Sequence, residues 1–103
     1  MYNTGKGVPQ DDGQAVRWYT KSAEAGNEFG QSTLGLMYES GLSVPQDYIL
    51  AHMWFNLAAA QSNKQATDNR DRLVKQMTPA QIVEAQKLAR EWQPTTETQK
   101  PAP

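Results

Sequence analysis

The chain has 103 residues, no Cys, one His, and ten Lys and Arg against eleven Asp and Glu, which gives a formal net charge of -1. The length suits one domain, and the lack of Cys excludes disulfides, Cys-ligated metals and thiol nucleophiles. The near-neutral charge offers no basic field for nucleic acid or an anionic membrane surface.

No run approaches the roughly 18 apolar residues of a membrane-spanning helix, and residues 1–12 lack the apolar segment of a secretory signal. We therefore expect a soluble protein, cytoplasmic as the sequence stands, and periplasmic or secreted if a signal lies upstream.

Five segments carry apolar residues at helical spacing, and none alternates at period two for long enough to form a strand. The predicted helices span residues 12–25, 28–40, 47–61, 64–76 and 79–92. Residues 93–103 hold three Pro and no large apolar side chain, so we expect a disordered tail.

Capping residues support these boundaries. Gly41 stands where a left-handed C-terminal cap favours glycine, and Asp47 and its counterpart Asp11 are placed to cap the helices that follow. Ser62 and Thr78 each begin a pattern typical of a capping box, which predicts two more helix starts.

The sequence contains an internal repeat. Residues 1–27 laid on residues 37–63 agree at 11 of 27 positions, among them glycine, proline, aspartate and tryptophan. Identities at such positions preserve turns and packing, which is typical of a duplicated structural unit. We predict an all-α fold, an α/α superhelical solenoid of about two and a half helix pairs.

Small residues mark the expected helix contacts. Gly35 inside a helix lowers stability by about 1 kcal/mol relative to Ala, so we expect it to admit a neighbouring helix or the indole of Trp18 or Trp54. Trp18, Trp54 and Trp92 stand at helical spacing beside Ala, which favours a core role for all three.

Residues 34–63, LGLMYESGLSVPQDYILAHMWFNLAAAQSN, resemble one Sel-one-like repeat (SLR), a helical-hairpin relative of the tetratricopeptide repeat. The matching positions are Leu34, Gly35, Met37, Tyr38, Gly41, Val44, Asp47, Ala51, Trp54, Phe55, Ala58 and Ala59. The resemblance implies one domain over residues 1–92, with a truncated repeat 1–26, a full repeat 27–62 and closing helices 63–92. It also implies a non-catalytic scaffold that binds proteins, often as an adaptor in bacterial complexes.

The sequence departs from the family pattern at two positions. Ser43 replaces a loop glycine, which predicts an altered loop at residues 42–45. Gly30 replaces the usual Ala, which predicts early fraying of the helix at residues 28–40.

Candidate catalytic and metal-binding residues are few. His52 lies off the apolar stripe, so we expect a surface or groove histidine rather than a metal ligand. Asp11 with Asp12, and Asp68 with Asp71, could form acid/base pairs, but capping and helical ion pairs explain them better. The expected ion pairs are Asp68–Arg72 and Asp71–Lys75. We predict no catalytic, cofactor or metal site; the alternative is a small enzyme acting on cell wall or a β-lactam, as suggested for cysteine-rich relatives.

The first helix of each pair in such a solenoid lines a concave surface that takes a peptide or a partner's helix. The predicted partner-binding residues on these helices are Gln31, Thr33, Leu36, Glu39, Arg70 and Lys75.

The alignment also predicts an uncovered N-terminal face. Met1 and Tyr2 align with Met37 and Tyr38, in the last turn of a first helix, so we expect the first helix of the opening pair to be absent. Trp18 and Tyr19 then form an association face, covered by a second copy in a homodimer or by helices outside this sequence.

Overall fold

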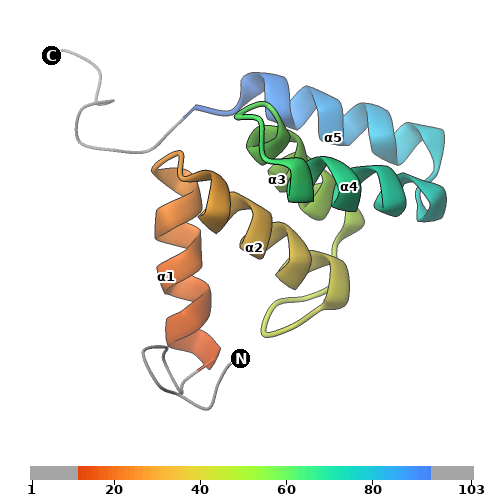
Figure 1. The fold of residues 1–103 in the computed structure, drawn as a ribbon. Coiled ribbons are helices and arrows are strands. Elements are labelled where there is room, and N and C mark those ends of the chain that lie inside the picture. Colours follow the sequence, from red (N-terminus) through yellow and green to blue (C-terminus); the bar gives the residue numbers. More distant parts are fainter. Residues whose placement is uncertain (1–11, 94–103) are drawn as a thin grey trace, which may run out of the picture.

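A computed structural model describes residues 12–93 of the chain (Figure 1). Its elements are α1 (Asp12–Glu24), α2 (Glu28–Ser40), α3 (Tyr48–Ala59), α4 (Lys64–Leu73), the 3-10 turn η2 (Val74–Gln76) and α5 (Pro79–Glu91). The described residues contain no strand, so the predicted all-α fold with five helices is confirmed. The predicted cap at Asp11 and the predicted tail beyond Gln93 lie outside the described residues.

Three predicted helix boundaries are formed by the residues that the sequence indicates. Asp47 accepts a hydrogen bond from the backbone N–H of Leu50 at 3.0 Å. Thr78 and Gln81 form a reciprocal capping box. Gly41 ends α2 with a φ of 74°, the left-handed conformation that glycine adopts without strain.

The predicted cap at Ser62 is wrong by one residue. Asn63 caps α4, accepting from the N–H of Ala66 at 2.8 Å, while Ser62 takes a left-handed φ of 72°. The same arrangement stands 36 residues earlier, where Asn27 caps α2 and Gly26 has a φ of 97°. The two copies of the sequence repeat therefore contain the same backbone turn, at residues 26–27 and at residues 62–63. The division into repeats 1–26 and 27–62 and closing helices 63–92 stays a prediction.

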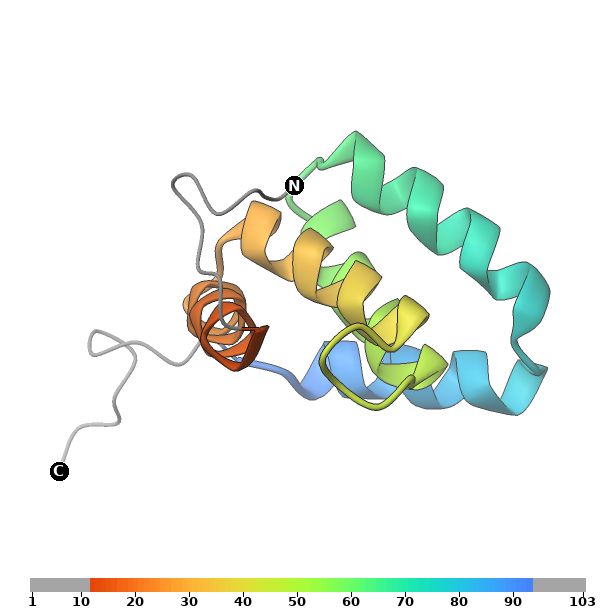
Figure 2. The ribbon, with the colours of Figure 1, turned by 90° about the horizontal axis from the view of Figure 1, so that it is seen from below.

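Helix α3 lies at the centre of the fold and contacts α2, α4 and α5 (Figures 1 and 2). Its two sides belong to two apolar clusters, one containing Met53 and Trp54 and the other containing Ala51 and Phe55. A helix that is apolar on both sides is a buried helix, which explains why the other elements gather around α3. Helix α1 packs mainly on α2.

Two glycines of α2 allow close helix contacts. A Cβ built on Gly35 would lie 2.6 Å from Cε1 of Phe55 and 3.2 Å from the carbonyl oxygen of Ala51. The close approach of a neighbouring helix that we expected is therefore confirmed, and the ring at the contact is Phe55 of α3 rather than an indole. A Cβ on Gly30 would lie 2.9 Å from the backbone N of Ala23. Gly30 thus brings α1 against α2. Helix α2 begins at Glu28, where the sequence predicts its start, and early fraying stays a prediction.

The three tryptophans have different surroundings. Trp54 is buried, and Trp92 is half-buried with its ring edge-on to Trp54 at a centroid distance of 5.9 Å. Trp18 is exposed, so its predicted place in the core is wrong. The reason is that α1 packs mainly on α2, whereas α3 is enclosed by three helices.

Ser43 keeps a left-handed φ of 65° in the loop after α2. The loop therefore has the backbone conformation of a glycine at a position where the sequence has serine.

Candidate protein-interaction surface

Gln31 is a buried structural residue. Its side chain is 1% exposed, donates from Nε2 to the carbonyl oxygen of Ala23 at 3.2 Å, and accepts from Nε2 of Gln61 at 3.0 Å. It joins α1, α2 and the turn after α3, and its polar atoms are satisfied inside the protein. The prediction that Gln31 lies on a binding surface is wrong, because its position faces the α1 side of α2.

Glu39 is engaged in a contact between helices. Both terminal nitrogens of Arg72 donate to its carboxylate, with Nη2 3.1 Å from Oε1. This hydrogen bond raises the pKa of Arg72, and burial opposes the rise. The pair joins α2 to α4 across 33 residues of sequence.

Arg70 also has internal partners. Its Nη1 donates to Oδ1 of Asn56 on α3 at 2.8 Å, and its Nε lies 3.5 Å from a carboxylate oxygen of Asp71. The expected pairs Asp68–Arg72 and Asp71–Lys75 do not form. Asp68 pairs with Lys64 instead, because the turn before it on α4 places the ammonium 3.1 Å away.

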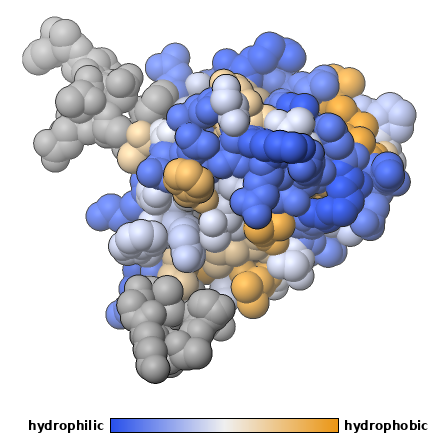
Figure 3. Space-filling view, in the orientation of Figure 1, coloured by the Kyte–Doolittle hydropathy of each residue, from blue (hydrophilic) through white to orange (hydrophobic). Residues whose placement is uncertain are grey.

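Three residues form an exposed stripe along α2. Phe29 is 68% exposed, Leu36 is 42% exposed and Thr33 is half-buried between them. Their spacing of i, i+4 and i+7 places them on one side of the helix. Figure 3 shows separate apolar side chains over α2 and the loop after it, next to a strongly polar surface over α4.

A groove lies between α1 and α2, and it is lined by Trp18 from α1 and by Phe29 and Thr33 from α2. The groove has a volume of about 260 Å³. Its lining residues are Trp18, Tyr19, Ser22, Asn27, Phe29, Gly30 and Thr33. We call it the aromatic groove. Four predicted site residues, Trp18, Tyr19, Thr33 and Leu36, thus lie in or next to one surface. Phe29 was not predicted, although its helical spacing from Thr33 and Leu36 could have indicated it.

The ring of Trp18 packs against the ring of a half-buried neighbour, Tyr19. Tyr19 meets it edge-on, with ring centroids 5.4 Å apart and an interplanar angle of 87°. Tyr19 is half-buried and packs against the cluster that contains Leu34 and Trp54. The exposed indole of Trp18 therefore contacts a side chain, Tyr19, that is itself packed against the core.

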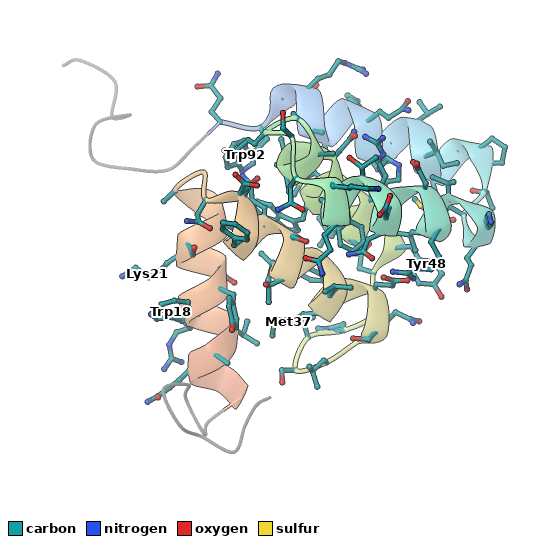
Figure 4. All side chains as sticks on the ribbon, viewed as in Figure 1. Trp18, Lys21, Met37, Tyr48 and Trp92 are labelled. Carbon is teal, nitrogen blue, oxygen red and sulfur yellow. The ribbon has the colours of Figure 1, made fainter. Side chains whose placement is uncertain are left out.

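A second depression lies on the other side of Trp18. Its volume is about 350 Å³, and it is lined by Gln14, Arg17, Trp18 and Lys21. Figure 4 shows Trp18 and Lys21 leaving the same side of α1. Arg17 and Lys21 are exposed, and neither forms an ion pair within residues 12–93. Trp18 thus lines both the aromatic groove and this second depression, which we call the basic depression.

His52 is buried, at 2% exposed, so the expected surface or groove position is wrong. Helix α4 covers this side of α3, and Nδ1 of His52 has no hydrogen-bond partner in the described chain. Burial lowers the pKa of His52, the cation of Arg70 lowers it further, and Asp71 partly opposes both. Residues 12–93 contain no group of three or more His, Cys, Asp or Glu side chains that could hold a metal ion.

Lys75 is exposed on η2, apart from the aromatic groove. No helix in the described part of the chain is both long enough and apolar enough to span a membrane.

Comparisons with known proteins found a matching family model and a similar solved structure. The model of the Sel1 repeat matches residues 1–27 and 30–63. The crystal structure of a protective antigen present in uropathogenic Escherichia coli strains, which displays an SLR fold, matches with a TM-score of 0.81 and 38% sequence identity. The match covers 85% of this chain and 19% of the antigen, so the chain spans about a fifth of that protein's length. No curated protein sequence matches the chain. The chain, with its repeated turns and helix pairs, belongs to the Sel1 repeat family.

Proposed function

We propose that this chain is a non-catalytic protein-interaction module whose docking surface is the aromatic groove and the adjoining stripe of α2. Sel1 repeats typically mediate protein interactions, and the similar structure of the E. coli antigen has an SLR fold. The proposal includes a role as an adaptor in a bacterial complex. The observation that carries the proposal is the exposure of three large apolar side chains, Trp18, Phe29 and Leu36, along α1 and α2.

The energetics of this surface favour docking. Large aromatic side chains bury the most area when a partner covers them, and tryptophan is enriched among the residues that dominate binding energy. Tyr19 supports Trp18, and the contact of Gly30 with α1 fixes the two walls of the groove relative to each other. A surface that is already ordered loses less conformational entropy on binding.

The remaining predicted residues have different roles in the proposal. Glu39 and Arg70 hold α2, α3 and α4 together through Arg72 and Asn56, so they support the surface rather than contact the partner. Direct partner binding by Lys75 stays a prediction.

Selection from a displayed peptide library tests the proposal. We expect the parent protein to enrich peptides whose affinity falls more than about ten-fold in Trp18→Ala and in Phe29→Ala. The matched control is Val83→Ala, which removes an equally exposed side chain from α5 and should leave the affinity unchanged.

Two results would contradict the proposal. One is enrichment only of peptides that bind Trp18→Ala and Phe29→Ala as tightly as the parent. The other is turnover of cell-wall fragments or of a chromogenic β-lactam, which would favour the enzyme alternative.

A further inference from the structure

We infer that the partner segment is an acidic amphipathic helix, with an apolar side chain in the aromatic groove and carboxylates that face Arg17 and Lys21. The inference rests on the proposed function and adds the chemical class of the partner. It follows from the charges beside Trp18, the size of the groove and the spacing of the α2 stripe.

The charge argument depends on which cations lack a carboxylate. On α4 each basic residue pairs with an acidic one within the described chain, as Lys64–Asp68, Arg70–Asp71 and Arg72–Glu39. Arg17 and Lys21 have no such partner and both line the depression beside Trp18. Within residues 12–93, Lys75 on η2 and Lys87 and Arg90 on α5 also form no ion pair, but none of them lines the depression beside Trp18.

The spacing of the two cations suits a helix. Arg17 and Lys21 stand four residues apart on α1, so they are separated by about 6 Å, one helical turn. Glutamates three or four residues apart on a partner helix have the same separation. A partner with carboxylates at this spacing can therefore meet both cations at once.

The apolar part of the surface has a matching geometry. The aromatic groove, at about 260 Å³, is smaller than the roughly 300–1,000 Å³ typical of small-molecule sites, so it suits one inserted side chain better than a cofactor. Leu36 continues the apolar surface along α2 beyond Phe29, with the half-buried Thr33 between them, at spacings of i, i+4 and i+7. Helices that bind in grooves present apolar anchors with this same spacing.

Trp18 connects the two halves of the proposed site. Its indole forms a wall of both the aromatic groove and the basic depression. A partner helix lying over Trp18 would place its apolar side on Phe29 and its acidic flank on Arg17 and Lys21. Two cations in a chain of net charge -1 are too few to hold a nucleic acid, which favours a protein partner.

The test uses three synthetic helical peptides with one apolar stripe and either Glu, Gln or Lys at the flanking positions. Binding to the full chain is measured by fluorescence anisotropy at low and high salt. We expect the Glu peptide to bind at least about ten-fold more tightly than the Lys peptide, because exposed ion pairs are favourable and like charges repel. This preference should shrink several-fold at high salt.

Matched variants separate charge from shape. The double variant Arg17→Gln/Lys21→Gln should weaken the Glu peptide about five-fold or more and leave the Gln peptide unchanged. The control Lys87→Gln/Arg90→Gln removes two exposed cations from α5 and should change neither affinity.

Each contrary result has a distinct meaning. Equal binding of the three peptides, lost in Trp18→Ala, would overturn the acidic partner and leave the proposed function standing. If none of the three peptides binds while library selection succeeds, the inference of a helical partner is overturned and the proposed function stands. If both assays fail, both proposals are overturned. A dimer in the parent and a monomer in Trp18→Ala, seen by light scattering, would identify a second copy as the occupant and overturn the inference.

Discussion

Trp18 and Trp54 occupy equivalent positions in the two copies of the repeat but have opposite surroundings. Trp54 is 6% exposed, with Trp92 edge-on against it, whereas Trp18 is 62% exposed. At this position of the repeat, tryptophan is therefore part of the core on α3 and lies on the surface on α1. This difference in cover, rather than a difference in sequence, makes Trp18 available to a partner.

The two tryptophans should differ in their effect on stability. We expect Trp54→Ala to lower the free energy of unfolding by about 3–5 kcal/mol, because it removes a large buried side chain. Trp18→Ala should cost less than about 1 kcal/mol, mainly the edge contact with Tyr19. Urea denaturation of both variants checks this, and equal losses would show that Trp18 is covered in solution.

Gly35→Leu should destabilise the protein by at least about 1–3 kcal/mol. Even the first carbon of the new side chain would meet the ring of Phe55 at 2.6 Å and the carbonyl oxygen of Ala51 at 3.2 Å. Thermal melting followed by circular dichroism measures the loss. Leu36→Ala, at the next and exposed position, serves as the control and should change stability by less than about 0.5 kcal/mol. A melting curve of Gly35→Leu that matches the parent would refute the close contact.

Ser62→Gly should stabilise the chain by about 0.5–1 kcal/mol. Serine at a φ of 72° has the strain that L-residues experience in the left-handed region, and glycine does not. The equivalent turn supplies the reciprocal change, because Gly26→Ser should lower stability by a similar amount at a φ of 97°. The two variants are compared by urea denaturation, and a loss of stability in Ser62→Gly would contradict the prediction.

Stability should fall in acid through His52. Its pKa is lowered in the folded protein by burial and by Arg70, from an ordinary value of 6.5. Above about pH 6.5 the ring is neutral in both the folded and the unfolded state, so it adds no pH dependence. Below that pH the unfolded chain binds a proton that the folded chain does not, and the free energy of unfolding falls by up to about 1.4 kcal/mol per pH unit until the folded pKa is reached.

The measurement for His52 is the urea midpoint between pH 7.5 and pH 5. His52→Leu is the control, since it keeps an apolar side chain in the same place and removes the titrating ring. Parallel pH profiles for the parent and His52→Leu would show that the histidine is accessible in the folded state.

The ion pair between α2 and α4 should contribute modestly to stability. A double-mutant cycle with Glu39→Gln and Arg72→Ala should give a coupling free energy of about 0.2–1 kcal/mol, the range for pairs with an exposed member. The coupling should decrease at high salt because the guanidinium is exposed to solvent. No coupling at low salt would mean that the two side chains do not meet in solution.

Local signals in the sequence determined where the helices begin and end. Gly41, Asp47 and Thr78 act through hydrogen bonds to residues three or four positions away, so their roles could be recognised without the fold. The repeat of 36 residues likewise indicated the helix pairs and the family. Helical spacing also brought Thr33 and Leu36 to one side of α2.

Only the tertiary structure decided which faces of these helices are covered. Gln31 and His52 lie inside because α1 and α4 pack over them, and Trp18 lies outside because its side of α1 has no such cover. Arg72 prefers Glu39, 33 residues away, to the carboxylate one turn before it. Burial and pairing of this kind depend on which helix is adjacent in space, which helical periodicity within one segment does not specify.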